Sequence, residues 1–210
     1  YEPYAVFSAL KERKEKDLSA IIIDVGSKTT RVSLARKGRF EDIKTFSFGG
    51  ESFTRRIASH FEVGFWEAEN IKKRFSRNEL GDEAQSTVTE IMQPEISIFL
   101  NALEMILKDF SRANLLPSNI YIHGGGGDIP LMDGIIRKKK WKRDLSFLDK
   151  PVLHRLKADM FENIEIENSK IESSRIISLL SVSDNILHTV SHRDDLLSKT
   201  MQRVVKLIHE

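Results

Sequence analysis

The residues with the clearest chemical potential lie where an apolar run stops at a carboxylate. Ile21–Ile23 lead into Asp24, Gly26 follows, and a second apolar run begins at Val32. This pattern predicts a strand, a tight turn and a returning strand. Such a turn offers backbone N–H groups and small hydroxyls to an anion such as a phosphate, beside an acid that can hold a hydrated Mg²⁺. The candidate phosphate loop consists of Asp24, Gly26, Ser27, Lys28, Thr29 and Thr30.

An ordinary hairpin is the alternative for this stretch, because Asp and Gly also serve turns that bind nothing. The motif gains weight from a second loop, in which four consecutive glycines follow the alternating apolar run Ile120–His123. Glycine is needed where φ is positive or where a ligand approaches the backbone closely. A flexible linker would carry Ser, Pro or charge around the glycines, whereas here Pro130 soon opens a predicted helix. We therefore interpret Gly124, Gly125, Gly126 and Gly127 as a ligand loop.

Two further pairs of residues lie between these loops. Gly49 and Gly50 open one predicted helix, and Glu69 and Lys72 lie in the next. Their i, i+3 spacing places Glu69 and Lys72 on one helix face, where a carboxylate can accept hydrogen bonds from sugar hydroxyls and an ammonium can offset phosphate charge. The alternative is an ordinary ion pair on an exposed helix.

The order of these motifs resembles the second half of the actin-like ATPases, and within them the bacterial cell-division protein FtsA and its relative PilM of type IV pilus machines. The resemblance covers residues 2–136. It implies an α/β, actin-like (ribonuclease-H-like) ATPase subdomain, with a three-stranded antiparallel meander and further strands flanked by helices. It also implies bound ATP or ADP with Mg²⁺. Asp24 would approach the metal through water, residues 26–30 the phosphates, Glu69 and Lys72 the ribose and base, and residues 124–127 the adenosine.

The phosphate loop departs from the family pattern, which usually reads Asp-hydrophobic-Gly-Gly-Gly-Thr-Thr-Asp. Ser27, Lys28 and Arg31 stand here in place of Gly, Gly and Asp. Their side chains crowd a phosphate, contribute cations to it, or mark a loop that no longer binds nucleotide productively. The family's other phosphate loop would precede Asp24, and nothing between Tyr1 and Asp24 supplies it. We therefore expect ATPase activity only in combination with an upstream half, and we assign no catalytic residue.

Alternation and helical periodicity predict the elements that position these residues. Strands are expected over residues 20–24, 30–36, 41–47 and 163–167, and helices over residues 52–59, 66–75, 86–113 and 173–187. We expect the third of these helices to kink at Pro94. We divide the chain into a leading helix (1–19), an actin-like domain with a reduced insert subdomain (20–190) and an amphipathic tail helix (191–210).

Composition indicates a folded protein in a reducing compartment. The chain has 210 residues, of which 40% are hydrophobic and 30% charged, and it has no cysteine. No apolar run approaches the ~20 residues of a membrane span, so a cytoplasmic location is expected. The net charge of +2 does not favour nucleic acid as a partner. The basic run Arg137–Arg143 is interpreted as the solvated end of a helix, with nucleic acid or anionic lipid as the alternative partner.

Residues 194–210 form an amphipathic, basic pattern. In FtsA-like proteins such a terminal helix meets an anionic membrane surface, and docking on its own domain is the alternative. The leading functional hypothesis is a nucleotide-gated, FtsA-like scaffold for cell-division or related machinery at the inner face of the cell membrane. It would self-associate or form an actin-like polymer, and it would bind a cytoskeletal or membrane-complex protein partner. One alternative is a nucleotide-inert, PilM-like docking module, and another is a fragment of a sugar or carboxylate kinase with an actin-like core.

Overall fold

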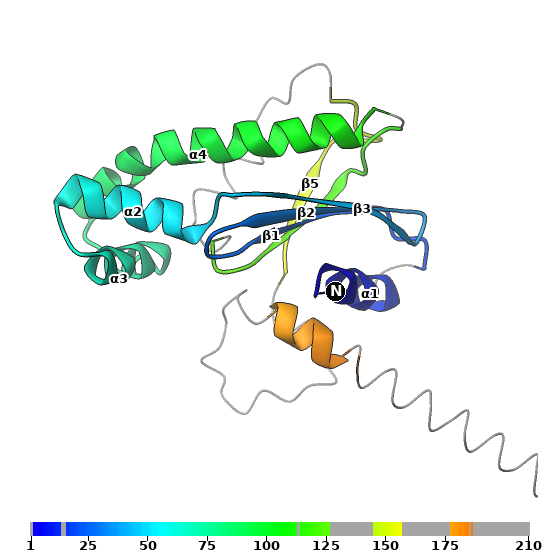
Figure 1. Cartoon of the computed structure of the whole chain (residues 1–210), viewed down its shortest axis with the longest axis horizontal. Helices are drawn as coiled ribbons and strands as arrows, with labels where there is room; N and C mark the ends of the chain where they lie inside the picture. Colours follow the sequence, from blue (N-terminus) through cyan, green and yellow to red (C-terminus); the bar gives the residue numbers. More distant parts are fainter. Residues whose placement is uncertain are drawn as a thin grey trace, which may run out of the picture.

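The computed structural model describes residues 2–13, 16–112, 114–126, 145–156, 177–184 and 186. In chain order its elements are α1 (Glu2–Arg13), β1 (Ala20–Val25), β2 (Thr30–Arg36), β3 (Arg39–Phe46), α2 (Gly50–Phe61), α3 (Phe65–Ser76), α4 (Asp82–Phe110), β4 (Asn119–His123) and β5 (Val152–Arg155). The strands form one five-stranded sheet with the order β3-β2-β1-β4-β5 (Figure 1). The pairs β1–β2 and β2–β3 are antiparallel, and the pairs β1–β4 and β4–β5 are parallel. The predicted α/β class and the antiparallel meander are confirmed.

The strands follow from their residue types. β1 reads Ala-Ile-Ile-Ile-Asp-Val and is buried along its whole length, as a central strand between two helical layers should be. β2 turns into β3 at Lys37 and Gly38, which have φ of 50° and 70°. Positive φ at both central residues is what a two-residue hairpin needs to match the twist of its strands. The edge strand β3 is largely exposed and rich in charge, which protects the sheet edge from pairing with another chain.

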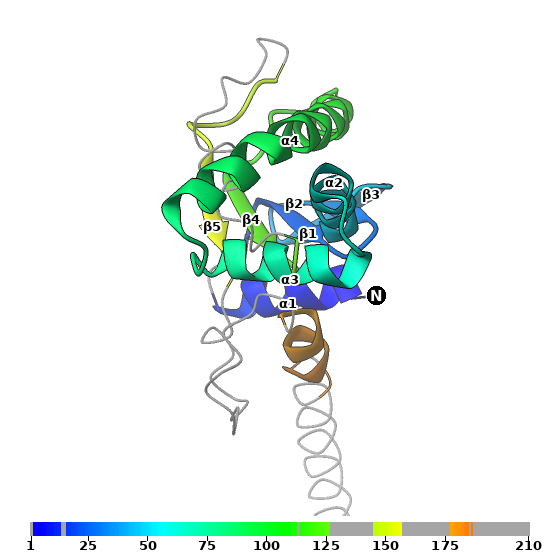
Figure 2. The same ribbon diagram turned by 90° about the vertical axis from the view of Figure 1, so that its left-hand side faces the viewer.

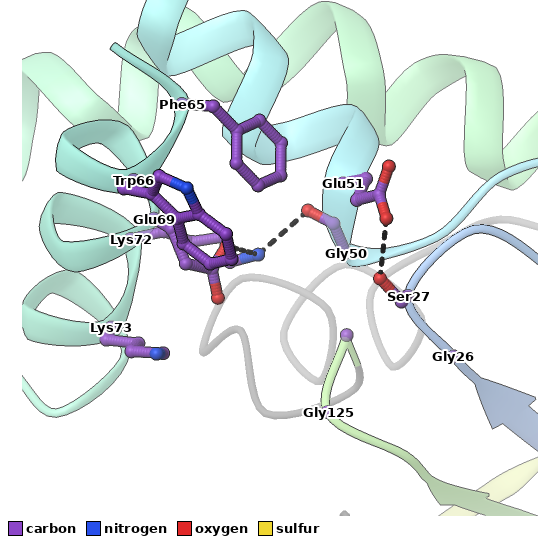
Figure 3. A pocket seen from close by; sticks show the side chains of 11 residues that line it. Gly26, Ser27, Gly50, Glu51, Phe65, Trp66, Glu69, Lys72, Lys73 and Gly125 are labelled. Atoms are coloured by element: carbon purple, nitrogen blue, oxygen red, sulfur yellow. Dashed lines mark hydrogen bonds and ion pairs between the residues drawn. The ribbon is translucent and has the colours of Figure 1, made fainter. Parts of the chain in front are cut away.

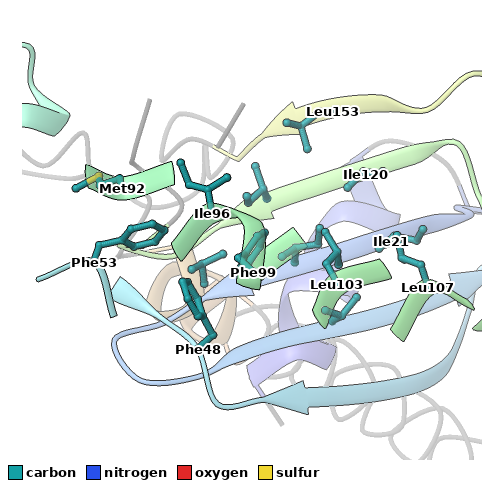
Figure 4. Packing of buried hydrophobic residues seen from close by; sticks show 14 of the residues in the cluster. Ile21, Phe48, Phe53, Met92, Ile96, Phe99, Leu103, Leu107, Ile120 and Leu153 are labelled. Atoms are coloured by element: carbon teal, nitrogen blue, oxygen red, sulfur yellow. The ribbon is translucent and has the colours of Figure 1, made fainter. Parts of the chain in front are cut away.

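Alternate residues of β1 face opposite layers. Ile21 and Ile23 belong to the core between the sheet and α4, whereas Ala20 and Ile22 belong to a second core under α1. Figure 1 shows α4 along one face of the sheet, with α1 and the helical residues 177–184 on the other, and Figure 2 shows the same layers from the side. Figure 4 shows Phe99 and Leu103 of α4 meeting side chains of the sheet.

The long helix α4 starts and ends earlier than predicted. Its first turn is polar, with Asp82 and Glu83 next to the N-cap Gly81, so the apolar periodicity gave no sign of it. Acidic side chains there suit the positive end of the helix dipole. Pro94 lies inside the helix, which continues through it to Phe110.

The helices α2 and α3 lie at the end of the sheet where β1 stops (Figure 1). α2 packs against both α3 and α4. Its buried residues include Phe53 and Ile57, and Nε of Arg56 donates a hydrogen bond to the carbonyl oxygen of Ile91 in α4 at 3.1 Å. The two helices are therefore anchored to the main core and form a wall beside the loop that follows β1.

Several predicted features lie outside the described residues. These are the strand over residues 163–167, the helix opened by Pro130, the basic run 137–143, Gly127 and the tail 191–210. Residues 177–184 are helical, within the helix predicted over residues 173–187. The domain boundaries stay predictions. Among the described residues, no helix combines the length and apolar character needed to cross a membrane.

The aromatic core under α4 yields a stability prediction. Phe99 is fully buried, and its ring lies 5.7 Å from the rings of both Phe46 and Phe48. Phe99→Ala should lower the free energy of unfolding by about 3–5 kcal/mol, because it removes buried surface and leaves a cavity. The neighbouring Ile98 is 54% exposed, so Ile98→Ala should cost less than about 0.5 kcal/mol. Urea unfolding measures both, and equal losses would contradict this packing.

Candidate functional site

Three loops that are distant in sequence are joined by backbone hydrogen bonds. The N–H of Gly50 donates to the carbonyl oxygen of Gly26 at 2.9 Å, and the N–H of Glu51 donates to that of Ser27 at 2.8 Å. The N–H of Gly126 donates to the carbonyl oxygen of Val25 at 2.9 Å. The parallel strands β1 and β4 both end here, and ligands commonly bind at the carboxyl ends of parallel strands.

Glycine is required where these loops approach one another. A Cβ atom on Gly49 would lie 2.5 Å from the carbonyl oxygen of Ser27, and one on Gly126 would lie 2.5 Å from Cγ1 of Val25. Gly124 has φ of +90°, and a Cβ atom there would meet the carboxylate of Asp24 at 2.6 Å. Gly124 and Gly126 of the second loop are therefore needed for close packing, which a flexible linker would not require.

A pocket of about 400 Å³ opens between these loops and α3. Figure 3 shows side chains of α3 on one side of it, Ser27 and Glu51 on the other, and Gly125 at the tip of the loop after β4. The predicted site residues that line the pocket are Gly26, Ser27, Gly50, Glu69, Lys72, Gly125 and Gly126. The predicted residues outside its lining are Asp24, Lys28, Thr29, Thr30, Gly49 and Gly124.

Lys72 is buried and Glu69 is partly buried, so the pair is not the exposed ion pair of the alternative interpretation. Nζ of Lys72 lies 2.7 Å from Oε2 of Glu69 and donates to Oγ1 of Thr54 at 2.7 Å and to the carbonyl oxygen of Gly50 at 2.9 Å. The hydroxyl of Thr54 donates to Oε2 of Glu69 at 2.6 Å. Burial tends to raise the pKa of Glu69, but the hydrogen bonds from Lys72 and Thr54 outweigh it and lower that pKa. The pair therefore joins α3 to the first turns of α2.

Two aromatic residues of the pocket were not predicted from the sequence. Phe65 and Trp66 begin α3 and line the pocket, and Trp66 is 78% exposed. An aromatic pair directly after Gly64, at the start of a helix that carries Glu69 and Lys72, was the available signal. Thr54 and Lys73 were also not among the predicted site residues. Lys73 lines the pocket, and Thr54 lies in the network behind it.

The phosphate loop differs from the expected anion cradle. The N–H of Gly26 donates to the carbonyl oxygen of Thr29 at 2.9 Å, and the N–H groups of Gly50 and Glu51 donate to the loop carbonyls described above. The hydroxyl of Thr30 is buried and donates to the carbonyl oxygen of Phe48 at 2.8 Å. These donors hold the loops together instead of pointing at a ligand. Lys28 and Thr29 are exposed.

Asp24 does not fit the expectation that it holds a hydrated Mg²⁺. Its Oδ2 accepts hydrogen bonds from Nε and Nη2 of Arg31 at 2.9 and 2.6 Å. The side chain lies outside the pocket lining and is 10% exposed. Among the described residues, no group of three acidic, histidine or cysteine side chains could hold a metal ion together. The assignment of Mg²⁺ to Asp24 stays a prediction, and Oδ2 of that carboxylate is already bonded to Arg31.

Comparisons with known proteins agree on one family and one fold. The sequence model of the family described as "Cell division protein FtsA" matches residues 21–193. The cell division protein FtsA of Bacillus subtilis (strain 168) is 26% identical over 90 residues, which are 43% of this chain and 20% of that protein.

Two solved structures are similar over most of this chain. A chain of a PilM-PilN type IV pilus biogenesis complex has a TM-score of 0.65 at 19% identity, covering 87% of this chain and 51% of that one. The ethanolamine utilization protein EutJ of Carboxydothermus hydrogenoformans has a TM-score of 0.56 at 20% identity, covering 86% of this chain and 52% of that one. At these identities the similarity shows the fold alone, and it confirms the predicted actin-like fold. The chain spans about half the length of these structures.

The buried network predicts unequal effects for two adjacent lysines. Lys72→Ala should lower the free energy of unfolding by about 3 kcal/mol, because it leaves Glu69 without its cation in a poorly solvated position. Lys73→Ala should change it by less than about 0.5 kcal/mol, because Lys73 lies at the pocket surface. Thermal and urea unfolding of both variants test this, and a similar loss for each would contradict the network.

The lowered pKa of Glu69 also predicts a pH dependence. A carboxylate with a depressed pKa stabilises the folded state fully above its unfolded-state pKa, here 4.5, and loses that effect as pH falls through the folded-state value. The stability difference between the unmodified chain and Glu69→Gln should therefore be largest near neutral pH and shrink below pH 4.5. Unfolding curves of both proteins across this range measure the difference, and a difference that grows on acidification would exclude the assigned sign.

Proposed function

Because this chain belongs to the FtsA family of cell division proteins, we propose that it binds an adenine nucleotide, ATP or ADP, in the pocket between α3 and the glycine loops. We propose further that nucleotide occupancy controls its assembly with other proteins. The observation that carries this proposal is the composition of the pocket wall. An exposed indole, a carboxylate that can accept hydrogen bonds and a lysine line one concave site at the ends of β1 and β4.

The pocket suits the nucleoside part of such a ligand. Its volume of about 400 Å³ lies within the usual range for small-molecule sites. Trp66 and Phe65 offer aromatic faces, and stacking of a base on such a face is worth about 1–3 kcal/mol. Glu69 offers an acceptor for ribose hydroxyls, and the glycines allow close approach of the backbone. Lys73 adds a cation at the pocket to offset phosphate charge.

The loop hydrogen bonds leave the proposed phosphate end of the pocket less suited to its ligand group than the nucleoside end. The N–H groups of Gly26, Gly50 and Glu51 already donate to carbonyl oxygens within the loops. A phosphate would have to displace them, and each displaced bond costs roughly 0.5–1.5 kcal/mol. We therefore propose that base and ribose supply most of the affinity of this chain. We propose no hydrolysis by the chain on its own.

The proposed consequence of binding is a population shift. A nucleotide that touches both α3 and the loops after β1 and β4 would favour one arrangement of these elements over others. That arrangement would in turn favour self-association or contact with a protein partner of the division machinery. We propose that this takes place in the cytoplasm at the inner face of the cell membrane. Contact of residues 194–210 with anionic lipid stays a prediction, since those residues lie outside the described part of the chain.

A second candidate function is a nucleotide-inert docking module. Two observations favour it: the occupied N–H donors of the phosphate loop and the fold similarity to a chain from a PilM-PilN type IV pilus biogenesis complex. In that case the pocket would stay unused by nucleotide, and a protein partner would bind with equal affinity in its presence and absence.

Calorimetric titration of adenosine, ADP and ATP into the chain tests the proposal. Saturable binding is expected for all three, with adenosine within about tenfold of ADP because the nucleoside wall carries most of the affinity. Trp66→Ala should weaken ADP binding by about tenfold, as expected for a lost stacking face, and Trp66→Phe should retain most of the affinity. Phe61→Ala is the matched control, since Phe61 is an exposed aromatic residue outside the pocket lining.

Gly125→Val tests the loop assignment in the same titration. Gly125 lines the pocket at the loop tip, so two added methyl groups and a Cβ should obstruct the ligand and weaken ADP binding by at least about tenfold. Unchanged affinity would reject the loop assignment. Absence of saturable binding for adenosine, ADP and ATP alike would reject the nucleotide proposal and favour the docking module.

A further inference from the structure

Strand register places three polar side chains in a row on the α1 face of the sheet. Asp24 of β1 is paired with Arg31 of the antiparallel β2 and with His123 of the parallel β4. Residues that face each other across neighbouring strands lie on the same side of the sheet and interact directly. The alternation of β1 puts Asp24 on the same face as Ile22, which packs under α1.

Arg31 holds one oxygen of the Asp24 carboxylate, and the other oxygen faces the buried ring of His123 at a distance too long for a hydrogen bond. Nε and Nη2 of Arg31 lie 2.9 and 2.6 Å from Oδ2, and Nδ1 of His123 lies 3.6 Å from Oδ1. His123 is almost fully buried, and burial lowers its pKa, so the ring is neutral near pH 7. The backbone of Gly124 lies close on the Oδ1 side, since a Cβ atom there would come within 2.6 Å of that oxygen. A hydrated divalent ion would have to displace the guanidinium to reach Oδ2, and it would meet the backbone of Gly124 on the side of Oδ1.

The guanidinium of Arg31 is held from its other edge as well. Nη1 lies 2.8 Å from Oε2 of Glu2 in α1. Burial tends to raise the pKa of Glu2, but hydrogen bonds from Ser178 and Arg31 outweigh it, so Glu2 is ionised. One cation therefore serves two carboxylates, and its planar fork is fixed from α1 and from β1 together. Rotating Arg31 away from Asp24 would cost contacts on both sides.

We infer that Arg31 is a built-in counter-cation for Asp24, so that this chain holds no divalent metal ion at Asp24 and binds nucleotide without one there. A guanidinium and a divalent cation compete for the same carboxylate oxygen and repel each other. Arg31 thus supplies, as part of the chain, the positive charge beside Asp24 that a dissociable metal ion would otherwise supply. The part of this inference that concerns nucleotide rests on the proposed function, whereas the part that concerns the metal does not.

Thermal unfolding with Mg²⁺ as the probe tests the metal part without any nucleotide. At about 5 mM Mg²⁺, against NaCl of equal ionic strength, the Tm of the unmodified chain should move by less than about 1 °C. Asp24→Asn keeps an acceptor for Arg31 and should give the same small response. Arg31→Gln leaves Asp24 and Glu2 together without their cation, so its Tm should rise with Mg²⁺ by about 4 °C. Arg31→Lys, which retains a cation, should show no such gain.

Two results would overturn the inference. One is Mg²⁺ stabilisation of the unmodified chain that Asp24→Asn removes, and the other is an Arg31→Gln variant that folds and gains nothing from Mg²⁺. If Arg31→Gln does not fold, the comparison between the unmodified chain and Asp24→Asn decides alone.

Titration of ADP with Mg²⁺ and with EDTA then tests the nucleotide part. The Kd for ADP in EDTA divided by the Kd in Mg²⁺ should be the same, within about twofold, for the unmodified chain and Asp24→Asn. If this quotient is about fivefold or more smaller in Asp24→Asn, the inference is overturned. If ADP does not bind in either buffer, the proposed function fails, while the Mg²⁺ unfolding result still decides whether Arg31 excludes the metal.

Discussion

The pairing of β1 with β2 on one side and β4 on the other is the constraint on which the rest of the structure depends. Because β1 is buried on both faces, its alternation sends Ile21 and Ile23 to the core under α4 and Ile22 to the core under α1. The same register fixes Asp24 between Arg31 and His123. Where β1 ends, the carbonyl oxygen of Val25 accepts the N–H of Gly126, so the loops after β1 and β4 are brought together. A one-residue shift in the register of β1 would exchange the two faces of the strand and disrupt both the core and the site.

Lys72 is a second constraint, because a buried ammonium is stable only when acceptors match its N–H donors. Those acceptors come from Gly50 and Thr54 in the first turns of α2 and from Glu69 on its own helix. The first turn of α2 is tied in turn to the carbonyl oxygen of Gly26. The wall formed by α3 and the loops after β1 and β4 is therefore one hydrogen-bonded unit. When a ligand binds to such a unit, few side chains or loops have to become ordered. The entropy cost of binding is therefore small, which favours affinity from a small contact area.

The local elements could be predicted from the sequence, whereas most long-range contacts could not. Alternation and turn residues were enough for the meander from β1 to β3, and helical periodicity was enough for most of α4. The meeting of the loops near residues 26, 50 and 126 depends on β1 lying next to β4, which no local pattern encodes, and it was expected only from a family resemblance. Trp66 was missed because exposure in a pocket has no local signature. The pairing of Arg31 with Asp24 was not predicted, although a turn over residues 26–29 brings these two residues opposite each other.

The hydrogen bonds that make this site rigid also separate its two ends chemically. On the phosphate side, the N–H groups of Gly26, Gly50 and Glu51 serve loop carbonyls, and Arg31 serves Asp24 and Glu2. On the proposed nucleoside side, the indole of Trp66 is exposed, and Glu69 and Lys72 are joined in an ion pair. Under the proposed function, recognition of a base and recognition of a phosphate would therefore be carried by different groups, and they could change independently. Under these proposals, Arg31 in place of the family's acid would alter the phosphate side without touching the wall that would hold the base, so independence of a metal at Asp24 would not require loss of nucleotide binding.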